Sequence, residues 1–201
     1  SDPLADGAVI QASSKRALTL GVTYDIVLEI IARARLSVPV VLFSYLNPIL
    51  AAGPDALERA AQAGAHGILI TDLPVGADPQ LERWFGAGPL AFIRLVAPTT
   101  PTDRMREITT HGSGFVYLIS RLGVTGARDD VPVELAATVA RLRGATALPI
   151  CVGFGIAHPD QAAAVAQLVD GIAVGSAVVR RAGERVADAV EFVAALRRGI
   201  D

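Results

Sequence analysis

Hydrophobic residues along this chain fall into two kinds of stretch, which alternate from one end of the sequence to the other. The first kind is a short, continuous apolar run bounded by glycine, proline or polar residues, a pattern typical of strands buried on both faces of a parallel sheet. We assign six strands, at 38–43, 67–71, 91–96, 114–119, 148–152 and 171–174. The second kind has apolar residues at helical spacing and predicts helices at 22–35, 54–63, 80–85, 102–110, 132–143, 159–168 and 185–198.

Local details accompany these assignments. The helix at 22–35 should turn one apolar face to the core, formed by Ile26, Val27, Ile30, Ile31 and Ala34. Thr102 is expected to cap the helix that begins there, because threonine favours this position. Residues 1–11 are turn-rich, and residues 45–48 are predicted to be a loop after the first strand.

Strict alternation of strands and helices indicates right-handed βαβ units and one parallel sheet. No linker or low-complexity tract divides the chain, so we expect one domain over residues 1–201. The last two strands end in small residues, Gly153-Phe154-Gly155 and Gly175-Ser176. Glycine at a strand end lets the backbone approach a ligand, and an eight-stranded α/β barrel commonly binds phosphate after its seventh and eighth strands. The pattern favours a phosphorylated ligand over plain tight turns.

Composition narrows the class of protein. The chain is 52% hydrophobic and 19% charged, with a net charge of -2, which is globular and offers no basic footprint for nucleic acid. No apolar run approaches the roughly 20 residues of a membrane span, so no membrane partner is expected. A single cysteine, Cys151, excludes an internal disulfide and fits a reducing, cytoplasmic setting.

The titratable residues narrow the chemistry further. The only lysine, Lys15, stands outside any strand end, so a Schiff-base mechanism is not favoured. His66 and His111 precede strands and only His158 follows one, so the histidines do not form a three-ligand metal site and none is expected. Acid–base chemistry by carboxylates remains.

Taken together, several motifs resemble the tryptophan synthase alpha chain family. They are SDPLADG at 1–7, YLNPI at 45–49, DLPV at 72–75, GFVYLISRLGVTGAR at 114–128, GFGI at 153–156 and VGSAVV at 174–179. The resemblance implies a TIM (β/α)8 barrel, of which this chain supplies strands 3 to 8. It also implies a lyase that cleaves indole-3-glycerol phosphate by a retro-aldol reaction to indole and glyceraldehyde 3-phosphate in L-tryptophan biosynthesis. Such a chain holds no cofactor of its own and works in an alpha-beta-beta-alpha complex, whose beta chain carries pyridoxal phosphate.

The same resemblance assigns roles to residues. Asp6 matches the catalytic aspartate, and Thr125 matches the loop threonine that hydrogen-bonds it. Tyr117, Phe43 and Asp72 match positions in or beside the indole pocket, although Tyr117 could equally be a core residue of its strand. The phosphate-binding positions match Gly126, Phe154, Gly155, Gly175 and Ser176.

The sequence departs from the family pattern at its start. The family has two further strands before SDP, and its catalytic glutamate lies on the second of them, so no residue here matches that glutamate. We therefore expect an N-terminally incomplete barrel whose 201 residues alone are inactive and poorly folded. An isomerase on the same scaffold would share the glycines and the alternation, but the SDPLADG and SRLGVTG motifs argue against it. Two other functions stay open: a stand-alone indole-3-glycerol-phosphate lyase, and a non-catalytic regulatory subunit that binds phosphate ligands.

Overall fold

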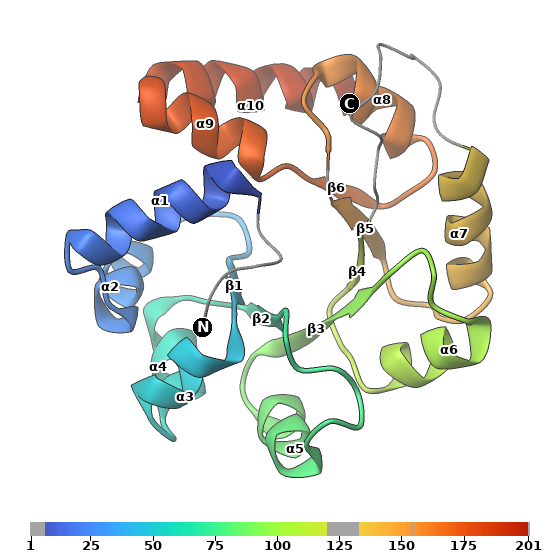
Figure 1. Ribbon diagram of the computed structural model, residues 1–201, viewed down its shortest axis with the longest axis horizontal. Helices are drawn as coiled ribbons and strands as arrows, with labels where there is room; N and C mark the ends of the chain where they lie inside the picture. The colour runs from blue at the N-terminus through green and yellow to red at the C-terminus, as the bar shows by residue number, and fades with distance from the viewer. Residues whose placement is uncertain (1–6, 120–132, 154, 201) are drawn as a thin grey trace.

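The computed structural model describes residues 7–119, 133–153 and 155–200. Its centre is a sheet of six strands in the order β1-β2-β3-β4-β5-β6, and every neighbouring pair is parallel. The strands follow one another around the middle of the molecule and the helices lie outside them (Figure 1). The predicted parallel α/β barrel architecture is confirmed. The strands are β1 (Val41–Ser44), β2 (Gly67–Ile70), β3 (Ala91–Val96), β4 (Val116–Ile119), β5 (Ile150–Gly153) and β6 (Gly171–Ala173).

Ten helices occur in the described part of the chain, and most stand between consecutive strands. They are α1 (Ala8–Thr19), α2 (Tyr24–Ala34), α3 (Leu46–Ala52), α4 (Ala56–Ala63), α5 (Pro79–Ala87), α6 (Thr102–Thr110), α7 (Val133–Arg143), α8 (Pro159–Ala166), α9 (Ser176–Glu184) and α10 (Val186–Ile200). None of these described helices is long and apolar enough to cross a membrane.

Three strands begin later than their apolar runs. β1 starts at Val41 instead of residue 38, because Pro39 has no N–H to donate to a sheet ladder. β4 starts at Val116 instead of residue 114, because Gly114 has a φ of 77°, outside the range of a strand. β5 starts at Ile150, directly after Pro149. In each case a proline or a glycine shortens the strand.

The apolar face predicted for α2 was partly wrong. Val27 and Ile31 pack against the core, whereas Ile26 is 36% and Ile30 is 59% exposed. The fully engaged residue is Leu28, which is 8% exposed. Thr23 caps this helix by accepting a hydrogen bond from the amide of Ile26.

Three helices were missed. The segment predicted as a loop at 45–48 forms the N-cap and the first turn of α3, and α1 and α9 were not predicted at all. Neither α1 nor α9 buries any residue fully. The apolar periodicity of α1 is weak, whereas α9 was missed although its apolar residues do gather on one face. Thr102 was also wrong as a cap, because Pro101 occupies the N-cap position of α6.

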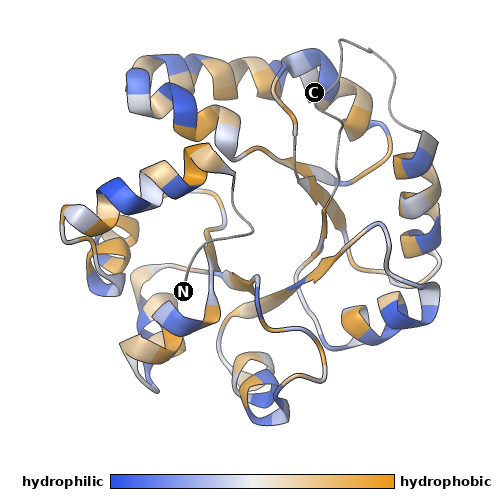
Figure 2. Ribbon diagram, viewed as in Figure 1, coloured by the Kyte–Doolittle hydropathy of each residue, from blue (hydrophilic) through white to orange (hydrophobic). Residues whose placement is uncertain are grey.

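Hydrophobic side chains form two layers, one on each side of the sheet. In β2, Ile68 and Ile70 belong to the layer under the helices, whereas Leu69 belongs to the cluster inside the curve of the sheet with Ile93 and Tyr117. This alternation follows from the two-residue period of a strand. Figure 2 shows hydrophobic strands surrounded by helices that carry both hydrophobic and hydrophilic positions. The inner cluster therefore forms the floor of any site at the end of the barrel.

Candidate active site

The carboxyl ends of all the described strands face the same way, because every strand pair is parallel. In α/β barrels this end carries the ligand-binding loops. Two of the predicted substrate contacts, Phe43 in β1 and Tyr117 in β4, meet here. Their ring centroids are 5.6 Å apart and the ring planes are inclined at 69°, an edge-to-face contact. Phe43 is 54% exposed and Tyr117 only 8%, so the pair presents an aromatic surface backed by the core.

Gly153 in β5 makes room for the ring of Tyr117. A Cβ atom at this position would lie 1.8 Å from the tyrosine hydroxyl oxygen, much closer than any real contact. Gly153 was predicted only as part of a turn-forming and phosphate-facing group, and its contact with Tyr117 was missed. Burial raises the pKa of Tyr117, and the neighbouring Cys151 adds to the shift, so the hydroxyl stays protonated at neutral pH.

Asp72 lies two residues after the end of β2, and its carboxylate caps α3. Its Oδ1 atom accepts a hydrogen bond of 2.7 Å from the amide of Leu46, the first residue of that helix. The carboxylate thereby satisfies an N–H group that the helix leaves unpaired. A residue predicted to neighbour the indole pocket thus joins the loop after β2 to the segment after β1.

The predicted phosphate contacts that the structure describes come from the last two strands. Gly153 pairs with Ala173, so Gly155 and Gly175 both stand two residues beyond one register position of β5 and β6. Gly155 has a φ of 85°, which favours glycine. Ser176 is the first residue of α9, with Gly175 at its N-cap. The first N–H groups of a helix are free to bind an anion and lie at the positive end of the helix dipole.

The other predicted site residues lie outside the described residues. They are Asp6, Thr125, Gly126 and Phe154. Within residues 7–119, 133–153 and 155–200, no three histidine, cysteine or carboxylate side chains gather closely enough to hold a metal ion.

Comparison with known proteins shows to which family this chain belongs. The family model for the tryptophan synthase alpha chain matches residues 1–198. The chain belongs to the tryptophan synthase alpha chain family. That family supplies the subunit that cleaves indole-3-glycerol phosphate in tryptophan biosynthesis, and the chain is accordingly of a lyase family.

Individual relatives agree with the family assignment. The tryptophan synthase alpha chain of Carboxydothermus hydrogenoformans is 48% identical over 89% of this chain and 68% of its own length. That of Geobacter sp. strain M21 is 44% identical over 100% of this chain and 78% of its own length. The crystal structure of tryptophan synthase subunit alpha from Legionella pneumophila superposes with a TM-score of 0.88 at 33% identity, covering 100% of this chain and 78% of that one. This chain therefore has the same barrel fold as the alpha chain of known structure.

Proposed function

We propose that this protein carries out the alpha reaction of tryptophan synthase, the cleavage of indole-3-glycerol phosphate to indole and glyceraldehyde 3-phosphate. The observation that carries the proposal is the placement of two unlike surfaces at one end of the barrel. Phe43 and Tyr117 offer an aromatic surface from β1 and β4. Gly155, Gly175 and Ser176 offer backbone N–H groups at the ends of β5 and β6. An indole ring fits the first surface and a phosphate the second.

The phosphate end serves to place the substrate. We assign it to Gly155, Gly175 and Ser176, together with Gly126 and Phe154 from outside the described residues. Binding energy from a phosphate remote from the reacting bond can be used to hold the indole and the glycerol carbon in a reactive orientation.

The reacting end needs a negative charge near the ring nitrogen. Cleavage protonates carbon 3 of indole, removes a proton from the glycerol hydroxyl as the aldehyde forms, and develops positive charge on the ring. We assign Asp6 to stabilise that charge, with Thr125 holding its carboxylate, because a fixed charge stabilises a transition state most where water is excluded. Tyr117, Phe43 and Asp72 then contact or surround the ring.

The partner we propose is a tryptophan synthase beta chain. Several of the similar solved structures are of tryptophan synthase from Mycobacterium tuberculosis, with TM-scores of 0.88 and 0.89. In the proposed alpha-beta-beta-alpha complex the alpha chain holds no cofactor, and pyridoxal phosphate is bound by the beta chain in the cytoplasm.

The substitution Asp6→Asn tests the role of the carboxylate. Asparagine keeps the size and hydrogen bonding of the side chain but removes its charge, so indole release should fall about a hundredfold or more. Binding of glycerol 3-phosphate, measured by calorimetry, should change less than about twofold because the phosphate contacts are untouched.

The measurement uses the full-length gene product, its length established by intact mass, saturated with beta chain. Unchanged indole release from the Asp6→Asn variant would remove Asp6 from the mechanism. A parallel loss of glycerol 3-phosphate binding would show that the variant had lost the site as a whole.

A further inference from the structure

The loop between β2 and α5, residues 71–78, is fastened at three points by hydrogen bonds to other segments. At its start, the carboxylate of Asp72 accepts the Leu46 amide of α3. In its middle, the guanidinium of Arg104 in α6 donates a hydrogen bond to the carbonyl of Val75. At the next residue, the amide of Gly76 donates to Oε1 of Glu82 in α5 at 2.6 Å. In two of the three, the side chain that makes the bond belongs to an outer helix, α5 or α6.

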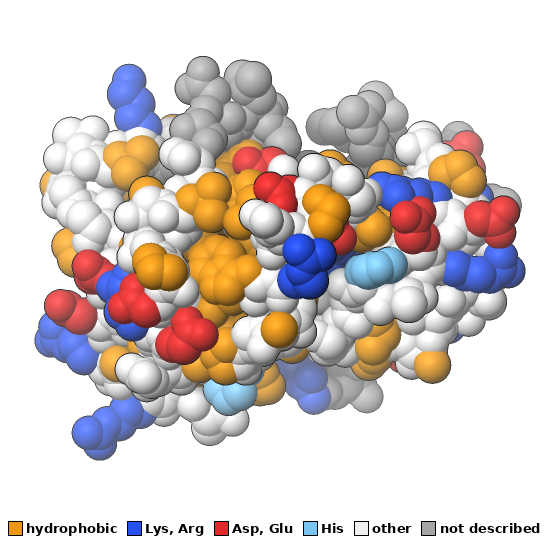
Figure 3. Space-filling view, turned by 90° about the horizontal axis from the view of Figure 1, so that it is seen from below, with side chains coloured by type: hydrophobic (Ala, Val, Ile, Leu, Met, Phe, Trp, Pro, Cys, Tyr) orange, Lys and Arg blue, Asp and Glu red, His pale blue; other side chains and the backbone are white. Residues whose placement is uncertain are grey.

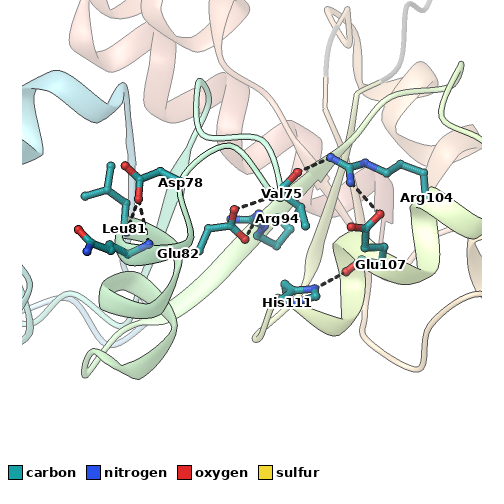
Figure 4. A network of polar contacts seen from close by, with 10 residues as sticks. Val75, Asp78, Leu81, Glu82, Arg94, Arg104, Glu107 and His111 are labelled. Atoms are coloured by element: carbon teal, nitrogen blue, oxygen red, sulfur yellow. Dashed lines mark hydrogen bonds and ion pairs between the residues drawn. The ribbon is translucent and has the colours of Figure 1, made fainter.

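Glu82 is itself held by a buried charge. Its other carboxylate oxygen, Oε2, lies 3.6 Å from Nη2 of Arg94 in β3, and the two side chains are 12% and 4% exposed. The guanidinium of Arg94 also lies over the ring of Phe92, 4.4 Å from its centroid. Figure 4 shows Glu82 beside Arg94 and, across from them, Arg104 reaching toward Val75. The Glu82 carboxylate that accepts the Gly76 amide is thus held in place by Arg94 of the underlying strand β3.

The guanidinium of Arg94 is a charged group buried between the sheet and the outer helices, where apolar side chains are the rule. Neither Nη1 nor Nη2 of Arg94 has a hydrogen-bond partner among the described residues. Burial lowers the pKa of Arg94, and Glu82 opposes the shift. A hydrophobic pair of similar volume would commonly be at least as stable as such an ion pair. The arrangement is better explained by where it holds Glu82 than by its contribution to stability.

The packing around the loop explains why polar bonds are needed there. A cavity of about 460 Å³ opens between α5 and α6, and Val75, Gly76, Glu82 and Glu107 are among the residues that line it. Val75 and Gly76 of the loop therefore border this cavity. Figure 3, which looks from below onto the view of Figure 1, shows acidic and basic side chains interspersed on this side of the molecule.

We infer that Glu82 and Arg104 are positioning residues for the substrate site. They hold residues 71–78, and through Asp72 they fix the start of α3, the helix that follows Phe43 in β1. Arg94 acts through Glu82. We call the hydrogen bonds of Glu82 and Arg104 to residues 71–78 the loop clamp. Loosening this clamp should disturb the aromatic end of the site and leave the phosphate end, on β5 and β6, unchanged. The inference rests on the proposed function for its kinetic consequence.

The test compares three single substitutions in α6 of the full-length protein. Arg104→Met keeps an unbranched apolar stem but removes the guanidinium and its donors. Arg104→Lys restores one donor group, and Arg106→Met is the control. Arg106 lies on the same helix, 56% exposed, and its guanidinium pairs with Asp103 instead of the loop. Hydrogen exchange of the Gly76 and Leu46 amides reports the clamp directly. The KM for indole-3-glycerol phosphate, with beta chain present, and the Kd for glycerol 3-phosphate report the two ends of the site.

For Arg104→Met we expect both amides to exchange about tenfold faster. The KM should rise about threefold or more, while the Kd for glycerol 3-phosphate stays within about twofold. In Arg104→Lys, the amide exchange rates and the KM should return most of the way to the values of the unsubstituted protein. Arg106→Met should match the unsubstituted protein in both. If Arg104→Met fails to fold, the milder Glu82→Gln should show the same pattern, since it weakens the hold on Gly76 without removing the acceptor.

Two results would overturn the inference. One is exchange and KM in Arg104→Met equal to those of Arg106→Met. The other is an equal loss of affinity for both ligands, which indicates general destabilisation. If the unsubstituted protein releases no indole at all, the proposed function fails, but the exchange of Gly76 and Leu46 still decides whether Arg104 holds the loop.

Discussion

Gly153 decides where the ring of Tyr117 can lie, because any side chain at this position would occupy the same space as the tyrosine hydroxyl. Gly153→Ala should force Tyr117 to move and weaken binding of indole-3-glycerol phosphate about tenfold. Overpacking of this kind also costs about 1–3 kcal/mol of unfolding free energy. Calorimetric titration and urea unfolding measure the two effects.

Gly86→Ala is the matched control for this substitution. Gly86 lies in the last turn of α5, and a Cβ atom there would meet no atom within 4 Å apart from its chain neighbours and the backbone of its own helix. Alanine in a helix interior should be neutral or slightly stabilising. Equal affinity for the substrate in the two variants would contradict a role for Gly153 in placing Tyr117.

Some roles of single residues could be predicted from the sequence, and others could not. Tyr117 and Phe43 could be placed near the site from their motifs, and the structure brings their rings together. The capping role of Asp72 could not be predicted, because its partner Leu46 stands 26 positions earlier in the chain. The burial of Arg94 could not be predicted either, since a strand pattern does not show which charged residue finds a partner in the helical layer.

At the scale of elements, Asp170 ties α7 to the start of β5. Its Oδ2 atom accepts hydrogen bonds from Arg143 at 2.6 Å and from the amide of Ile150 at 2.7 Å. The hydrogen bond from Arg143, followed by that from Ile150, lowers the pKa of this carboxyl. The residue therefore stabilises the fold only while it is ionised.

The direction of the pKa shift of Asp170 determines the pH range over which this residue stabilises the fold. Because the folded-state pKa lies below the unfolded value of about 3.9, the stabilisation is complete above that value and is lost as the pH falls through the folded-state pKa. Asp170→Asn should lower the unfolding free energy at pH 7 by up to about 1 kcal/mol, since the side chain is partly exposed. The difference from the unsubstituted protein should disappear at the acid end of the window.

Urea unfolding between pH 7 and the acid limit of folding measures this difference. Glu191→Gln, which changes an exposed carboxylate on α10, is the control and should leave the profile unchanged. A constant difference for Asp170→Asn over the whole range would show that charge plays no part in the tie.

Of the elements predicted at their observed bounds, β3 has an apolar run that fills the whole strand. α6 was also placed correctly, although Met105 and Ile108 are its only apolar residues. α3 was missed because Pro48 reads as a loop signal, although proline is tolerated in the first turn of a helix. The exposure of Ile30 was missed because helical spacing shows which residues share a face, not what that face meets.

At the scale of the whole molecule, the parallel sheet places every predicted contact that the structure describes at the same end. The phosphate end lies on β5 and β6, and the aromatic end spans β1 and β4. Within the described residues β1 and β6 do not pair with each other, and Val41 and Phe43 on β1 are partly exposed. That the 201 residues alone are poorly folded stays a prediction, for which unpaired edges of this kind are the physical reason.

The central claim, that this protein is the indole-releasing subunit of a two-chain enzyme, is tested most directly by titration. Indole released from indole-3-glycerol phosphate is measured for the full-length gene product as tryptophan synthase beta chain is added. Indole release should increase with added beta chain and level off at about one beta chain per alpha chain. Substrate binding without indole release at any ratio would contradict it and leave a regulatory phosphate-binding subunit, and full release without any beta chain would contradict it in favour of a stand-alone lyase.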